Sequence, residues 1–209
     1  MKKENILNIL LEEKIISIVR LKNGELTPQV IYNLVKGGIK ALEITSNTPN
    51  FDIQIKAARK KHPNILVGAG TITTLKLAQI AIKAGAQFLV TPNTNKATVE
   101  ESIKADIPVI MGAFTPTETA NAVLYGADII KLFPAGQMGI SYYKSLKAPF
   151  SDTKFFAVGG IDLDNTEEWL NAGIDGLGLG SSLVKTDINT NEELNNIISK
   201  AQQFKKLTK

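Results

Sequence analysis

The sequence predicts an α/β protein: a closed (β/α)8 TIM barrel preceded by a short N-terminal helix, formed by residues 1–209 as a single domain. Eight short apolar runs rich in Ile, Val and Leu alternate with longer segments of helical periodicity, which is the pattern of βαβ units around a parallel sheet. A similar helix-to-strand turn also recurs, as in GGIK-ALEI, AGAQ-FLVT, YGAD-IIKL and AGID-GLGL. Barrels of roughly this length commonly form one domain.

The elements follow in order along the chain. The first 14 residues, MKKENILNILLEEK, predict a short amphipathic helix, because Glu4, Glu12 and Glu13 interrupt any run long enough for a signal peptide or membrane span. Most helical segments end on a glycine that suits a left-handed helix C-terminus. The predicted strands are the apolar runs 15–19, 41–45, 66–70, 88–92, 108–113, 128–134, 155–160 and 176–180. The predicted helices between them include 28–38, 75–85, 115–126 and 163–173.

An open, doubly wound sheet is the competing fold. It would place a G-x-G-x-x-G turn after the first strand, where this chain has IVRLKNGEL instead. The closed barrel is therefore the better prediction.

Composition restricts the classes of function. Hydrophobic residues make up 44% of the chain and charged residues 21%, as in ordinary globular proteins. The net charge of +4 comes from lysines scattered over helical segments, so neither nucleic acid nor a membrane is an expected partner. The chain has no cysteine, which rules out disulfides and thiolate nucleophiles and fits a reducing, cytoplasmic location.

Polar residues gather at the predicted strand ends, where a (β/α)8 barrel carries its active site. Two of them, Lys131 in ADIIKLFP and Glu43 in ALEIT, interrupt otherwise apolar strands, and either charge would be costly to bury alone. Together they offer a nucleophilic amine and a carboxyl group that can transfer protons. A buried structural ion pair, or a lysine that reaches solvent between barrel and helices, is the alternative. The full set at strand ends is Arg20, Glu43, Thr45, Asn47, Thr71, Thr91, Lys131, Gly159, Gly160, Gly180, Ser181 and Ser182.

Two predicted strands end in the glycine-rich turns AVGGI and LGLGSS. Backbone amides at Gly159, Gly160 and Gly180, assisted by the Ser181 hydroxyl, can hold a phosphate, and barrel enzymes often bind phosphate after their last two strands. Alternatively, these glycines only fill tight corners of the barrel.

Metal-dependent chemistry is not expected, and no cofactor is predicted. The single histidine, His62, lies in a polar, lysine-rich helix end where we expect it to be solvated, and one histidine without cysteine does not make a metal-ligand set. By pattern alone Trp169, Phe133, Phe155 and Phe156 are packing residues.

Over nearly its whole length the chain resembles the 2-keto-3-deoxy-6-phosphogluconate and 2-keto-4-hydroxyglutarate aldolases. The matching segments are IVR at 18–20, GGIKALEIT at 37–45, VGAGT at 67–71, AGAQFLVTP at 84–92, GADIIKLFPA at 126–135 and the closing GGI and GSSLV. The resemblance implies a cofactor-free class I aldolase that acts on 2-keto acids and forms a homotrimer.

The resemblance also implies roles for individual residues. The lysine of the KxFP element, here Lys131, would form the Schiff base, and the glutamate of the LE[IV]T element, here Glu43, would act as acid and base. Thr71 and Pro92 match positions that line the pyruvyl pocket, and Phe133 of the KxFP element joins the expected substrate-binding residues. Arg20, at the end of the first strand, is expected to grip the substrate carboxylate.

The chain departs from the family pattern at two positions. Asn47 stands where some members have an arginine, a function that Arg20 can supply, and Val158 precedes the glycine pair where threonine is common. The expected reaction is cleavage of a 2-keto-3-deoxy-6-phospho sugar acid to pyruvate and an aldehyde such as glyceraldehyde 3-phosphate. The alternatives are a 2-keto-4-hydroxyglutarate aldolase, a catalytically altered phosphate-binding paralogue, or another phosphosugar barrel enzyme.

Overall fold

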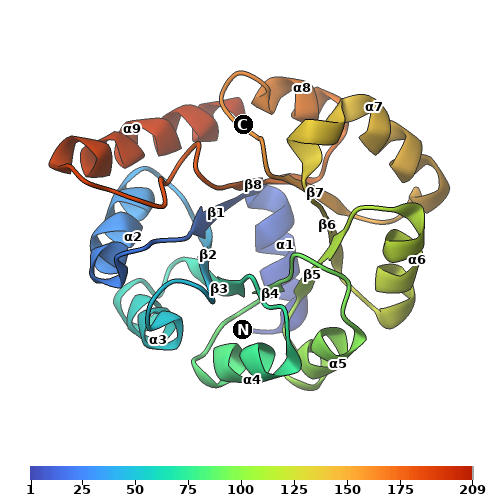
Figure 1. The fold of residues 1–209 in the computed structure, drawn as a ribbon, viewed down its shortest axis with the longest axis horizontal. Helices are drawn as coiled ribbons and strands as arrows, with labels where there is room; N and C mark the ends of the chain where they lie inside the picture. Colours follow the sequence, from blue (N-terminus) through green and yellow to red (C-terminus); the bar gives the residue numbers. More distant parts are fainter. Residues whose placement is uncertain (209) are drawn as a thin grey trace.

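In the computed structural model, which describes residues 1–208, eight parallel strands close into a barrel in the order β1 to β8, surrounded by helices (Figure 1). The strands are β1 Ile15–Val19, β2 Ala41–Thr45, β3 Leu66–Gly70, β4 Leu89–Val90, β5 Val109–Ala113, β6 Ile129–Leu132, β7 Phe155–Val158 and β8 Gly176–Leu179. The α-helices are α1 Lys3–Glu13, α2 Thr27–Lys36, α3 Phe51–Lys61, α4 Leu75–Lys83, α5 Lys96–Lys104, α6 Pro116–Tyr125, α7 Ala135–Lys147, α8 Thr166–Asn171 and α9 Asn191–Leu207. Two short 3-10 helices are η1 Gly24–Leu26 and η2 Ala148–Phe150. The predicted barrel with its N-terminal helix is confirmed.

Glycine ends four of the predicted helices in the expected conformation. Gly38, Gly85, Gly126 and Gly173 have φ values of 94°, 91°, 94° and 87°. Only glycine adopts this left-handed conformation without steric cost, so each helix ends at this turn and the chain enters the next strand.

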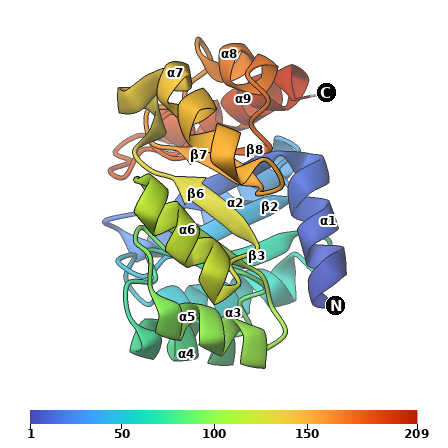
Figure 2. The ribbon, with the colours of Figure 1, turned by 90° about the vertical axis from the view of Figure 1, so that its right-hand side faces the viewer.

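The N-terminal helix covers one end of the barrel. Its buried residues Ile6 and Leu10 pack against apolar residues inside the barrel, including Leu66 and Phe88. Lys3 of α1 also pairs with Asp128, at the start of β6, with Nζ and Oδ1 2.7 Å apart. Figure 2 shows α1 lying across this end. The helix therefore closes the amino-terminal end of the barrel, and the carboxyl ends of the strands remain available for a site.

Glu13, at the end of α1, forms salt bridges with two segments that are distant in the sequence. Its carboxylate oxygens lie 2.6 Å from the Lys205 ammonium of α9 and 2.9 Å from the Lys40 ammonium before β2. Burial opposes ionisation of Glu13, but the hydrogen bonds and charges of Lys205 and Lys40 outweigh it and lower its pKa.

We predict that Glu13→Gln lowers the free energy of unfolding by about 1 kcal/mol at neutral pH, because it leaves two lysines without their partner. A group whose pKa is lowered by folding stabilises the fold above its unfolded value of 4.5, and this contribution is lost as pH falls through the folded-state pKa. Urea denaturation of both proteins across this range, with the exposed Glu12→Gln as control, measures the effect. A difference that persists at low pH would contradict the assignment.

Candidate active site

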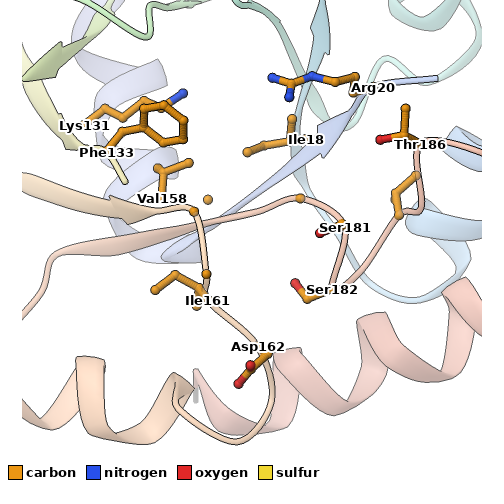
Figure 3. Close-up of a pocket in the computed structure, with 15 residues that line it drawn as sticks. Ile18, Arg20, Lys131, Phe133, Val158, Ile161, Asp162, Ser181, Ser182 and Thr186 are labelled. Carbon is orange, nitrogen blue, oxygen red and sulfur yellow. The ribbon is translucent and has the colours of Figure 1, made fainter. Parts of the chain in front are cut away.

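A cavity of about 510 Å³ opens at the carboxyl ends of β1, β6, β7 and β8 (Figure 3). It contains most of the predicted site residues, which come from segments far apart in the chain. The lining residues are Ile18, Arg20, Lys131, Phe133, Val158, Gly159, Gly160, Ile161, Asp162, Gly178, Gly180, Ser181, Ser182, Val184 and Thr186.

Lys131 extends from β6 into the barrel interior. Its side chain is only 4% exposed, and its ammonium lies 4.9 Å from the centre of the Phe133 ring at the cavity wall. The neighbouring Ile130 and Leu132 alternate to the opposite face and belong to the core between strands and helices. The lysine therefore points into the barrel, and the alternative of a lysine directed between barrel and helices is wrong.

Glu43 extends from β2 into the same interior and is 2% exposed. It lines a small void next to the main cavity, and Lys131 and Val158 line both spaces. No nitrogen of Lys131 lies within 4.0 Å of a Glu43 oxygen, and the carboxyl group makes no hydrogen bond with any residue in 1–208. The two residues are neighbours without forming a structural ion pair, so both retain free polar atoms for chemistry.

Burial shifts both groups toward their neutral forms. Burial lowers the pKa of Lys131, with a further lowering by the Arg20 charge, while the charge of Glu43 acts in the opposite direction. Burial likewise raises the pKa of Glu43 against the influence of Lys131 and Arg20. Since only a neutral amine attacks a carbonyl carbon, the environment makes Lys131 a nucleophile at a lower pH than an exposed lysine.

Arg20 stands at the cavity mouth, where its Nη2 donates a hydrogen bond to Oγ1 of Thr71 at 3.2 Å. Thr71 has φ of 57°, a strained conformation for a β-branched residue, and the Ser46 hydroxyl donates to its carbonyl oxygen at 2.7 Å. Thr71 thus holds the guanidinium rather than lining the cavity itself. The fork of Arg20 has donors left for a carboxylate.

Of two further predicted substrate-binding residues, Phe133 lines the cavity and Pro92 does not. Phe133 is 38% exposed and lines the cavity, so its interpretation as a packing residue was wrong, whereas Phe155, Phe156 and Trp169 are buried in the core as predicted. Pro92 lines neither cavity that Lys131 lines; its backbone packs against Gly112, which pairs with Lys131 in the sheet.

The glycine-rich turns after β7 and β8 meet in the cavity, as predicted. Gly159 and Gly160 have φ values of 87° and 73°, and the Gly159 carbonyl accepts a hydrogen bond of 2.8 Å from the amide of Gly136. After β8 the chain makes a helical turn in which the amides of 183 and 184 both donate to the Gly180 carbonyl. Residues 160, 161, 181 and 182 line the cavity, and their amides donate no hydrogen bond within residues 1–208. Free amides beside one cavity suit an oxyanion.

Several lining residues were not predicted from the sequence. Ile18, Ile161 and Val184 form apolar parts of the wall, and Thr186 adds a hydroxyl. Ser182, one of the predicted strand-end residues, also lines the cavity, but its Oγ is buried without a hydrogen-bond partner among residues 1–208. Ile18 was detectable in principle, because it lies two residues before Arg20 on β1 and therefore faces the same side of the strand. The loop residues had no signal besides their proximity to Ser181.

His62 lies outside this cavity, in a shallow space between α2 and α3. The residue is half-buried and its Nε2 is buried without a hydrogen-bond partner among residues 1–208, so the ring is less solvated than predicted. Within the same residues no three His, Asp or Glu side chains gather in a group that could hold a metal ion. No helix among these residues is long and apolar enough to cross a membrane.

The fold and the site define a barrel protein with a buried lysine and a neighbouring buried carboxyl group beside the cavity at the carboxyl ends of its strands. The family model for KDPG and KHG aldolases matches residues 6–200, so the chain belongs to this aldolase family. It is 34% identical over 154 residues to the 2-dehydro-3-deoxy-6-phosphogalactonate aldolase of Escherichia coli K12, covering 73% of this chain and 75% of the relative. It is also 34% identical over 158 residues to the 2-dehydro-3-deoxy-phosphogluconate aldolase of Treponema pallidum Nichols, covering 75% of each.

A solved structure extends the comparison. The KDPG aldolase of Legionella pneumophila, with pyruvate captured as a covalent carbinolamine, has a TM-score of 0.81 and 27% identity, covering 97% of this chain and 95% of the other. These findings confirm the family predicted from the sequence motifs. Aldolases are carbon–carbon lyases, so the predicted enzyme class is confirmed as well.

Proposed function

We propose that this aldolase cleaves a 2-keto-3-deoxy-6-phospho sugar acid to pyruvate and glyceraldehyde 3-phosphate through a Schiff base on Lys131. The observation that carries the proposal is one cavity containing a buried amine, a carboxylate-binding arginine and a group of free backbone amides. These groups match the keto carbon, the carboxylate and the phosphate of such a substrate.

Lys131 supplies the covalent step. Its neutral amine attacks the C2 ketone to give a carbinolamine, and loss of water then forms an iminium ion. When the C4 hydroxyl loses its proton, the C3–C4 bond breaks, its electrons pass into the iminium group, and an enamine and an aldehyde result. Protonation and hydrolysis of the enamine release pyruvate and regenerate Lys131. The iminium accepts the electrons, so these steps require neither a metal nor an organic cofactor.

Glu43 is suited to move the protons in this sequence. Burial raises the pKa of its carboxyl, so the protonated form persists to a higher pH than in an exposed glutamate, which suits a group that both donates and accepts protons. Arg20 holds the C1 carboxylate from the cavity mouth. This orients the keto carbon toward the Lys131 amine.

The free amides after β7 and β8 hold the phosphate in this proposal. In Figure 3, Ser181 and Ser182 lie on one loop of the cavity, and Lys131, Val158 and Ile161 lie on its other side. A phosphate dianion there accepts hydrogen bonds from backbone amides of the glycine-rich turns. The fold loses no hydrogen bond, because these amides have no other partner. The two ends of the substrate are thus recognised by different charged groups.

Ser181→Asp tests the phosphate end. A carboxylate among these amides repels a dianion, so we predict a rise in KM for the phosphorylated substrate by at least about tenfold, equivalent to about 1.4 kcal/mol of binding. An unphosphorylated 2-keto-4-hydroxy acid and the trapping of pyruvate at Lys131 should be affected much less. Ser199→Asp, on an exposed position of α9, controls for the added charge. Equal losses for both substrates would mean that the glycines only shape the barrel, and would favour the unphosphorylated 2-keto-4-hydroxyglutarate as substrate.

The configuration of the sugar acid is open to a direct assay. Relatives are named for the phosphogluconate and for the phosphogalactonate acid, which differ at C4 and release the same two products. Apolar parts of the cavity wall are formed by Ile18, Val158 and Ile161. The rate of pyruvate release, measured separately with each acid, shows which configuration at C4 the enzyme cleaves.

We also propose that the enzyme assembles as a homotrimer. Three apolar side chains stand exposed on α5 and α6: Ile103 at 52%, Val123 at 42% and Leu124 at 79%. Apolar groups clustered on adjacent helices are typical of a surface that is covered in an assembly. The cytoplasmic location stays a prediction from the sequence.

A further inference from the structure

Gly70, the last residue of β3, lies against the Glu43 carboxyl group. A Cβ atom added at position 70 would lie 2.3 Å from Oε1, 2.6 Å from Cδ and 3.1 Å from Cγ of Glu43. A Cβ atom essentially never lies closer than 3.0 Å to a non-bonded heavy atom, so any side chain at position 70 excludes the present position of the carboxyl group.

The backbone at this position does not itself require glycine. Gly70 has no positive φ, in contrast to Gly159 and Gly160, and lies in a regular strand paired with Thr45. Glycine within a strand weakens it and often marks a close approach by another group. The three atoms nearest to an added Cβ all belong to Glu43. Glycine at this position is therefore explained by the carboxyl group and not by local geometry.

The register shows what this space does for Glu43. Glu43 pairs with Gly68, yet its carboxyl lies beside Gly70, two residues closer to the catalytic end of the barrel. The space at Gly68 is filled by the Phe88 ring, which an added Cβ there would approach to 2.4 Å. Because the carboxyl makes no hydrogen bond within residues 1–208, packing rather than polar contacts sets its direction.

We propose that Gly70 is a positioning residue, whose missing side chain lets the Glu43 carboxyl turn toward the catalytic end of the barrel and face the substrate. With alanine at 70, the carboxyl must rotate away from its position for proton transfer while Lys131, Arg20 and the phosphate turns stay in place. The proposal rests on the role of Glu43 in the proposed function. The expected result for Gly70→Ala is a fall in kcat of at least about tenfold with little change in KM.

A double-mutant cycle with Glu43→Asp tests the contact itself. In this shorter side chain the carboxyl carbon takes the place of Cγ, 3.1 Å from the added Cβ, and its two oxygens can rotate about χ2 away from position 70, so most of the overlap is relieved. We expect Gly70→Ala to lower Tm markedly in the wild-type background and much less in the Glu43→Asp background. In the Glu43→Asp enzyme, Gly70→Ala should also reduce kcat by less than about threefold. If Gly70→Ala can be recovered folded only together with Glu43→Asp, the same conclusion follows.

Gly68→Ala is the matched control on the same strand and face. Its overlap is with Phe88, so its loss of Tm should be equal in the wild-type and Glu43→Asp backgrounds. The proposal is overturned if Gly70→Ala keeps wild-type kcat, or if its effects on Tm and kcat are the same in both backgrounds. The Tm cycle does not depend on catalysis, so a coupled Tm with a fully active Glu43→Gln enzyme would refute the proposed acid–base role and leave the steric contact intact.

Discussion

Lys131→Ala is expected to abolish aldol cleavage while leaving the barrel folded. The substitution removes the amine that forms the covalent intermediate, and no other lysine among residues 1–208 lines the cavity. Losses on removal of a covalent nucleophile are large, so we predict that kcat/KM falls by at least about 10³-fold. Stability should suffer little, since a buried ammonium outside an ion pair contributes no net stabilisation. Pyruvate release and the thermal unfolding transition are the two measurements.

Two controls make this result interpretable. Lys131→Met keeps most of the side-chain volume and should be equally inactive, which separates the chemistry of the amine from packing. Lys206→Ala, on the exposed face of α9, should keep full activity. A Lys131→Ala enzyme with wild-type cleavage would end the assignment of the Schiff base to this residue.

Glu43→Gln is expected to slow turnover by about 10²-fold or more, the usual scale for loss of a positioned proton donor and acceptor. Its pH dependence carries a second, independent signature. The charge of Glu43 raises the pKa of Lys131 against the effect of burial, so the neutral glutamine lowers that pKa further. The rate of imine trapping with pyruvate should therefore reach its plateau at a lower pH in Glu43→Gln than in the wild type.

Borohydride trapping at a series of pH values, beside steady-state cleavage, measures both effects. A lower pKa of Lys131 leaves more of its amine neutral at any pH below the plateau. Unchanged turnover together with an unshifted profile would assign Glu43 to packing rather than to proton transfer.

The barrel and the burial of Lys131 and Glu43 inside it could be predicted because their signals are local. Lys131 and Glu43 break apolar strands at the barrel's catalytic end, and a charge in such a run has few structural explanations. Glycines mark the ends of four predicted helices, just before the chain enters the next strand. The family motifs then connected this pattern with one chemistry.

What the sequence could not predict depends on contacts between distant segments. Nothing in VGAGT indicates that Gly70 leaves room for a carboxyl on β2, or that Thr71 holds Arg20 from β1. The pattern alone assigned Phe133 to packing, and only the family resemblance placed it among the substrate-binding residues. An aromatic residue directly after an apolar strand has the same pattern whether it packs inside or lines a cavity mouth. The solvation of His62 was overestimated because the flanking lysines are exposed while the packing of α2 against α3 shields its ring.

The most direct test of the central claim is reductive trapping of the imine. The purified protein is incubated with pyruvate and sodium borohydride, and the labelled peptide is located by mass spectrometry. Hydride adds to the carbon of the iminium group, so the proposed chemistry predicts one reduced pyruvyl group per chain, attached to Lys131 and absent from Lys131→Ala. No adduct at saturating pyruvate, or an adduct distributed over surface lysines, would contradict a Schiff-base mechanism at this residue.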